Sequence, residues 1–129
     1  MTKQILRISG NFFICDDKDG LPNLYKSFLE RNDLKGKVDI QLFSEAAPLD
    51  SLDYVVAIIT DGDMPGLTGG EFAKAARAQG YKGLIFLITS DVAEYTRYER
   101  YVTELICKDS ADVQGMMKTC AEFIEAVLV

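Results

Sequence analysis

Two carboxylates one residue apart follow an apolar segment near the middle of the sequence. The segment Val55–Ile59 has the two-faced apolar character of a buried strand, and Asp61 and Asp63 stand just behind it. A second acidic pair, Asp16 and Asp17, follows a shorter apolar run nearer the N-terminus. Carboxylates in such positions either form turns or supply ligands and nucleophiles, so their chemistry depends on whether the two pairs meet in the fold.

A hydroxyl group and an ammonium group stand at two further strand ends. Thr89 closes the apolar run 83–89, and Lys108 follows the run 103–107. Alone, such residues are most often turn formers or solvated charges. In an open parallel sheet, however, ligands bind just beyond the carboxyl ends of the strands. Polar residues at most of the strand ends therefore predict one shared pocket.

The predicted pocket has the chemistry of a phosphoryl-binding site. Carboxylates crowded there would repel one another by about 4 kcal/mol per pair at ~4 Å, so a cation is expected among them. Oxygen ligands without histidine or cysteine favour a hard cation, and two carboxylates with carbonyls and waters suit Mg²⁺. With Lys108 as a second positive charge and the Thr89 hydroxyl as a donor, a carboxylate can attack a phosphorus atom.

Apolar runs of strand length alternate with segments of helical period along the chain. We expect strands at 11–15, 37–43, 54–60, 83–89 and 103–107. We expect helices at 21–29, in a short Pro-interrupted segment after the second strand, at 71–80, at 92–102, and at 113–127 with Ser110 as N-cap. This alternation predicts an α/β domain with right-handed crossovers and a five-stranded parallel sheet that has helices on both faces. Residues 1–10 are expected to form an N-terminal extension or an extra strand, before a domain at 11–129.

The composition narrows the classes of protein. The chain has 129 residues, enough for one domain, and no apolar run approaches the ~20 residues of a membrane span. Its net charge of −6, with lysine and arginine dispersed, argues against nucleic-acid binding. The N-terminal residues lack the long apolar segment of a secretory signal peptide, so we expect a cytoplasmic location.

Cysteine and histidine usage excludes further chemistries. Cys15, Cys107 and Cys120 are widely spaced among apolar neighbours, which predicts buried reduced thiols and neither a disulfide framework nor a zinc knuckle. The chain contains no histidine. Catalytic triads that use histidine and a phosphohistidine relay within this chain are therefore excluded.

At this point the sequence resembles the receiver domain of bacterial two-component response regulators, which are CheY-like domains. The resemblance extends over nearly the whole chain from Asn11 and implies a flavodoxin-like fold with strand order 2-1-3-4-5. The matching features are an acidic pair after the first strand, a D-x-x-M-P-x-x-x-G stretch, a hydroxyl residue and a lysine, found at Asp16-Asp17, Asp61–Gly69, Thr89 and Lys108.

The resemblance also implies a function and a role for each matching residue. Asp61 is implied to be the phosphoacceptor, and Thr89 and Lys108 to bind the phosphoryl oxygens. The residues implied to hold Mg²⁺ are Asp16, Asp17, Asp61 and, through its backbone carbonyl, Asp63. The donor would be a sensor histidine kinase or a phosphotransfer protein, and phosphorylation would alter a surface for an unnamed downstream target. Such a domain signals and is no enzyme beyond its own phosphorylation and dephosphorylation.

The sequence departs from the family pattern at three places. Asp109 follows the lysine where the family has proline, and a cis non-proline bond would cost about 2.5–4 kcal/mol, so we expect a trans, reshaped loop or a strained one. The family's switch aromatic falls on Leu105, which has no ring. The segment between Thr89 and the lysine is short, which predicts a short or displaced fourth helix. Its tyrosines either face the sheet or form an aromatic partner surface, and they are Tyr95, Tyr98 and Tyr101.

Two other functions fit parts of the pattern. Asp61-x-Asp63 after a strand, then a threonine and a lysine, also resembles the haloacid-dehalogenase-type phosphatases, in which Asp61 would be the nucleophile and Asp63 the general acid. That family has its metal-binding acidic pair after the lysine, whereas Asp16-Asp17 precede every other motif here. The complete set Asp17, Asp61, Thr89 and Lys108 argues against a degenerate receiver that works as a phosphorylation-independent interaction module, whereas the missing aromatic and proline favour some loss of conventional switching. Pairing with a second copy of the chain stays open.

Overall fold

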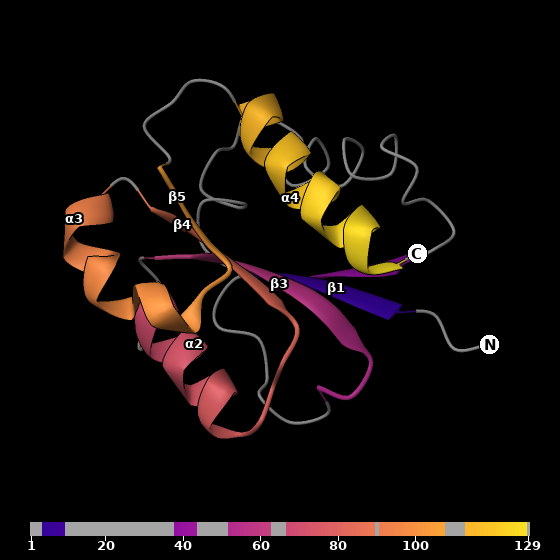
Figure 1. Cartoon of the computed structure of the whole chain (residues 1–129), viewed down its shortest axis with the longest axis horizontal. Coiled ribbons are helices and arrows are strands. Elements are labelled where there is room, and N and C mark those ends of the chain that lie inside the picture. The colour runs from indigo at the N-terminus through magenta and orange to yellow at the C-terminus, as the bar shows by residue number, and fades with distance from the viewer. Residues whose placement is uncertain are drawn as a thin grey trace.

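The described part of the chain is a β-sheet with helices on both faces (Figure 1). The computed structural model describes residues 4–9, 38–43, 52–62, 67–89, 91–107 and 113–128. The helix α4 (Val113–Leu128) lies on one face of the sheet, and α2 (Gly69–Ala78) lies on the other. The α/β class predicted from the sequence is confirmed.

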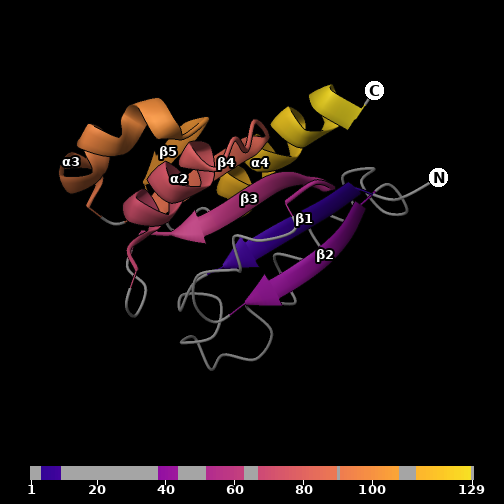
Figure 2. The same cartoon turned by 90° about the horizontal axis from the view of Figure 1, so that it is seen from below.

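All neighbouring strands of the sheet are parallel. The strands are β1 (Gln4–Ser9), β2 (Val38–Phe43), β3 (Val55–Asp61), β4 (Leu84–Thr89) and β5 (Glu104–Cys107). Their order across the sheet is β2-β1-β3-β4-β5, and the arrows of β1, β2 and β3 point the same way in Figure 2. Because all these strands run parallel, their carboxyl ends lie at one edge of the sheet.

The first strand lies earlier in the chain than the sequence predicted. The strand between β2 and β3 is Gln4–Ser9, within residues 1–10, where the sequence left an extra strand open; the strand predicted at 11–15 lies outside the described ranges. Arg7 interrupts the apolar run of residues 4–9. A prediction based on apolar character therefore did not assign the first strand of the sheet to these residues. The Arg7 side chain is only 7% exposed, and its Nε donates a hydrogen bond to Oε1 of Gln41 on β2 at 3.1 Å. A hydrogen-bonded guanidinium is thus accommodated inside the sheet, and residues 4–9 belong to it.

Helix α2 begins earlier than predicted because of its cap. Thr68 and Glu71 form a capping box, in which the Thr68 hydroxyl oxygen accepts from the Glu71 N–H at 3.2 Å and a Glu71 carboxylate oxygen accepts from the Thr68 N–H at 3.2 Å. The helix ends at Ala78, and Gly80 follows with φ of +92°, the left-handed conformation that favours glycine. Gly80, the last residue of the range predicted for this helix, therefore marks its end.

The segment predicted as one helix at 92–102 is a short α-helix followed by a 3₁₀-helix. These are α3 (Val92–Tyr95) and η3 (Thr96–Tyr101). Side chains three residues apart eclipse each other in a 3₁₀-helix, so the three tyrosines form a row with ring centroids 6.1 and 6.4 Å apart. Tyr95 is buried, whereas Tyr98 and Tyr101 are half-buried. The prediction of a short helix between β4 and β5 is confirmed. Of the three tyrosines, only Tyr95 is buried in the core.

Arg77 of α2 fixes the end of this segment to the rest of the fold. Its Nε donates to the Tyr101 carbonyl at 2.9 Å, and its Nη1 donates to the carbonyls of Tyr81 at 2.9 Å and Gly83 at 2.8 Å. The guanidinium carbon also lies 5.5 Å from the centroid of the Tyr81 ring. Partial burial lowers the pKa of Arg77, an effect that the neighbouring Tyr81 opposes. One side chain therefore joins η3, the loop before β4 and α2.

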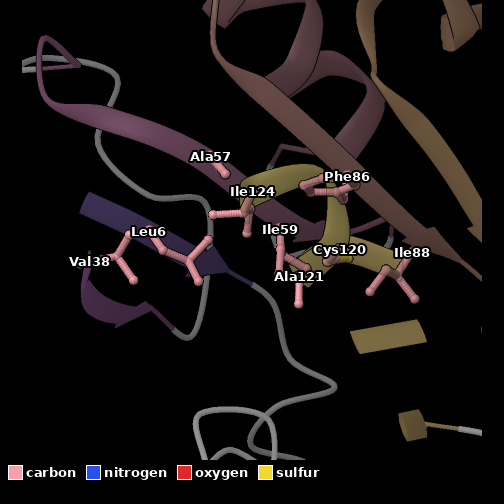
Figure 3. Packing of buried hydrophobic residues seen from close by; sticks show 9 residues of the cluster. All are labelled: Leu6, Val38, Ala57, Ile59, Phe86, Ile88, Cys120, Ala121 and Ile124. Carbon is pink, nitrogen blue, oxygen red and sulfur yellow. The ribbon is translucent and has the colours of Figure 1, made fainter. Parts of the chain in front are cut away.

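Helix α4 covers its face of the sheet through a continuous apolar cluster (Figure 3). The buried members of the cluster are Leu6, Val38, Ala57, Ile59, Phe86, Ile88, Cys120, Ala121 and Ile124. Phe86 also packs against Phe123 of α4, with ring centroids 5.7 Å apart. None of the helices within the described ranges combines the length and apolar character that crossing a membrane demands.

The opposite face of the sheet packs against α2. Phe72, Ala73 and Ala76 of this helix form a second buried cluster with Ile58 of β3 and Ile85 of β4. Successive side chains of a strand point to opposite faces, so Ile58 and its neighbour in sequence serve different clusters. This is the two-faced apolar strand that the sequence predicted.

The two described cysteines differ in their environments. Cys120 is buried, as predicted, and burial raises the pKa of its thiol. Cys107 is exposed at the end of β5, so the prediction of a buried thiol is wrong there, because the side chain stands at the open edge of the sheet. Cys15, the helix predicted at 21–29, the Pro-interrupted helix and the Ser110 cap lie outside the described residues.

Candidate functional site at the carboxyl ends of the strands

The carboxyl ends of β3, β4 and β5 are aligned. Asp61, the last residue of β3, has Ile88 as its register partner, and Thr89, the last residue of β4, has Cys107. Lys108 follows Cys107 directly in the sequence. The sheet therefore brings the backbone of Asp61 and the side chain of Thr89 to the same edge, which is where ligands of open parallel sheets bind.

The predicted site residues are described to different extents. Thr89 is fully buried, and Asp61 is described as the end of a strand but not in its side chain. Among the residues that the structure describes, no group of three acidic or thiol side chains is close enough to hold a metal ion. The remaining predicted members lie outside the described ranges, and they are Asp16, Asp17, Asp63 and Lys108.

The turn after Asp61 is packed closely against β4. The Gly62 N–H donates to the Ile88 carbonyl at 2.9 Å, and the Gly62 carbonyl accepts from the Gly69 N–H at 2.9 Å. A Cβ atom at Gly62 would lie 2.9 Å from the Cβ of Thr89 and 3.0 Å from its Oγ1. The close approach of Thr89 thus requires glycine directly after the predicted phosphoacceptor.

The Thr89 hydroxyl also organises the start of α3. Its Oγ1 accepts from the Asp91 N–H at 3.0 Å, and a carboxylate oxygen of Asp91 accepts from the Glu94 N–H at 3.2 Å. The first of these is the local turn that a threonine after a strand often makes. A hydroxyl has one O–H to donate in addition to its acceptor lone pairs, so this turn is compatible with donation to a ligand.

Tyr95 is a further member of the site that sequence reasoning did not assign to it. Its hydroxyl donates to the Gly62 carbonyl at 2.7 Å, and its side chain is 2% exposed. Its Cε2 would lie 3.0 Å from a Cβ at Gly62, beside the corresponding contacts of Thr89. The available signal was the three-residue spacing of the tyrosines, which is the period of a 3₁₀-helix and places all three on one side.

Gly62→Ala is expected to lower the free energy of unfolding by about 1–3 kcal/mol, the usual cost of overpacking. The added methyl group would meet the Cβ of Thr89, which is fixed to the backbone of β4 and cannot swing away as the end of a long side chain could. Urea denaturation followed by circular dichroism measures the change. A midpoint equal to that of the wild type would contradict the close approach of Thr89.

The fold is that of response-regulator receiver domains. The REC domain of AraT, a response regulator from Geobacillus stearothermophilus, superposes with a TM-score of 0.71 at 15% identity, over 98% of this chain and 96% of that one. Full-length FixJ from B. japonicum gives 0.66 at 22% identity, over 99% of this chain and 60% of that one. The non-phosphorylated HemR receiver domain from Leptospira biflexa gives 0.65 at 16% identity, over 98% and 94%.

The likeness to these proteins is one of structure. No protein-family model matches the sequence, and no curated protein matches it. The resemblance that the motifs indicated therefore has its support in the arrangement of the sheet and helices.

Proposed function

We propose that this chain is a phosphoacceptor signalling domain of a two-component system, in which Asp61 receives the phosphoryl group. The observation that carries the proposal is the contact between a fully buried hydroxyl residue, Thr89, and the backbone turn directly after Asp61. The fold shared with response-regulator receiver domains supports the assignment of these two strand ends to a phosphorylation site. Lys108 follows the neighbouring strand end in the sequence and completes the set.

The proposed reaction is transfer from a phosphohistidine of a partner kinase or phosphotransfer protein. A carboxylate oxygen of Asp61 forms a bond to phosphorus while the bond from phosphorus to the histidine nitrogen breaks, and that nitrogen keeps the electron pair. The Thr89 O–H donates to a phosphoryl oxygen, and the Lys108 ammonium neutralises another. The acceptor residue therefore becomes an acyl phosphate, whose added charge is the signal.

A divalent cation fits the chemistry of the proposed donor set. The carboxylates of Asp16, Asp17 and Asp61 and the carbonyl of Asp63 are all hard oxygen donors, which suit Mg²⁺. The cation would neutralise the charge that gathers on the phosphoryl oxygens. Among this chain's own residues, Thr89 then orients the group and Asp61 attacks it.

One observation favours a second candidate, an interaction module that works without phosphorylation. Leu105, at the position of the family's switch aromatic, is a half-buried residue of β5 and has no ring to change its orientation. A chain of this kind would present a constant surface to its partner. Phosphoryl uptake separates the two candidates.

The test is incubation of the purified chain with Mg²⁺ and acetyl phosphate, followed by intact mass spectrometry. We expect a mass gain of one phosphoryl group in the wild type, and none in Asp61→Asn or after Mg²⁺ is removed by EDTA. Asp53→Asn is the matched control, because Asp53 is exposed in the turn before β3, at the opposite end of that strand. This control should accept the group as the wild type does.

Two other outcomes of this experiment would favour a different function for the chain. Absence of an adduct with acetyl phosphate and with phosphorylated kinase would favour the phosphorylation-independent module. Rapid hydrolysis of many phosphate esters, lost in Asp61→Asn, would favour the haloacid-dehalogenase-type phosphatase.

A further inference from the structure

Tyr95 contacts both halves of the candidate site. Its hydroxyl donates to the Gly62 carbonyl at 2.7 Å, in the turn that follows Asp61. Its ring edge approaches Gly62 from the same side as Thr89, since a Cβ at Gly62 would meet Thr89 and Tyr95 at 2.9–3.0 Å. A shift of either the turn or Thr89 therefore changes the space that the Tyr95 ring occupies.

We propose that Tyr95 is a positioning residue that holds the Asp61–Gly62 turn and links the state of this turn to α3 and η3. The inference rests on the proposed function, because the event that moves the turn is phosphorylation of Asp61. The hydrogen bond is buried, so losing the donor would leave a carbonyl with one partner fewer, away from water. The chain thereby has an aromatic link to its site although Leu105 offers none.

The link continues along the row of tyrosines. The ring of Tyr98 follows that of Tyr95, with centroids 6.1 Å apart, and packs directly over Gly70 at the start of α2. The ring of Tyr101 comes next, 6.4 Å away, and its backbone carbonyl accepts the hydrogen bond from Arg77. Tyr95 thus holds α3 and η3 to the candidate site, and Tyr101 holds them to α2. A displacement of Tyr95 must therefore be accommodated by the residues between Tyr95 and Tyr101.

The exposed side of η3 is the surface at which a partner would detect a displacement of the tyrosine row. Arg97 lies over the ring of Tyr98 at 5.1 Å, and Arg100 lies over the ring of Tyr101 at 5.0 Å. Both arginines are exposed, while both rings are half-buried. Movement of the tyrosine row would therefore also move these guanidinium groups, which are a common kind of partner contact.

Hydrogen exchange measured by mass spectrometry tests the inference on the full chain. Wild type, Tyr95→Phe and the control Tyr98→Phe are each measured with Mg²⁺ alone and with Mg²⁺ plus acetyl phosphate, and phosphoryl uptake is read from the intact mass. Tyr98→Phe removes a hydroxyl from the same row without touching the Gly62 carbonyl. Far-UV circular dichroism verifies that each variant is folded.

Without donor, we expect amides 92–101 and the Gly69 amide to exchange about fivefold faster in Tyr95→Phe than in wild type, and no such change in Tyr98→Phe. With donor, exchange of amides 92–101 should change in wild type and in Tyr98→Phe, and this response should be lost in Tyr95→Phe. Phosphoryl uptake with an equal response in Tyr95→Phe and wild type would overturn the inference. Absence of uptake in wild type would overturn the proposed function instead, and equal exchange without donor would show independently that Tyr95 does not hold the turn.

Discussion

Phe86→Ala is expected to lower the free energy of unfolding by about 3–5 kcal/mol, the range for removing a fully buried aromatic ring. Phe86 has no exposed surface, and its ring fills the space between β4 and Phe123 of α4. The truncation leaves a cavity in the cluster that joins α4 to the sheet. Urea denaturation monitored by circular dichroism gives the free energy from the midpoint and the slope.

The control for this experiment is Val127→Ala on the exposed side of α4. Val127 lies in α4 but is 52% exposed, so the substitution should change stability by no more than about 0.5 kcal/mol. Equal losses in the two variants would contradict the packing of α4 on the sheet.

Arg77→Ala is expected to cost about 2–3 kcal/mol, because it removes the donor to three backbone carbonyls at once. The carbonyls of Tyr81 and Gly83 belong to the loop before β4, and that of Tyr101 belongs to the end of η3. Arg77→Lys should restore only part of the loss, since one ammonium group cannot reproduce the planar arrangement of guanidinium donors. The measurement is again the urea midpoint.

Arg97→Ala is the matched control for Arg77. Arg97 is exposed and lies over the Tyr98 ring at 5.1 Å, so its loss should cost about 0.5–1 kcal/mol at most. Equal losses in Arg77→Ala and Arg97→Ala would contradict a stabilising role for the three hydrogen bonds of Arg77.

The elements with an uninterrupted pattern were predictable from the sequence. β3 and β4 are apolar on both faces and were placed within one residue, and α4 keeps one apolar face along its length. The first strand was expected at 11–15 because the pattern of β1 contains Arg7, and the sequence does not reveal that Gln41 of β2 accepts a hydrogen bond from it. The sequence also predicted one helix at 92–102, where the structure has α3 followed by η3. Local sequence does not distinguish α from 3₁₀ geometry when tertiary contacts contribute, such as that of Tyr98 with Gly70 of α2.

Of the candidate site, the structure describes the strand ends at Asp61 and Thr89 and contacts that the sequence did not reveal. The strand ends gave Asp61 and Thr89 from periodicity and the rule for open sheets, and both are at the predicted edge of the sheet. Tyr95 was missed because its hydroxyl binds a backbone carbonyl, and main-chain acceptors leave no trace in the residue types. The same is true of Gly62, whose lack of a side chain has meaning only beside Thr89.

The identity of the acceptor that Tyr95 uses has a genetic consequence. Every residue has a main-chain carbonyl, so the acceptor of this bond does not depend on a side chain; position 62 must supply only the glycine that lets Tyr95 and Thr89 approach. The donor, in contrast, depends on a single codon at position 95. A Tyr-to-Phe exchange at position 95 is therefore enough to remove the proposed link without changing the residue proposed to accept the phosphoryl group.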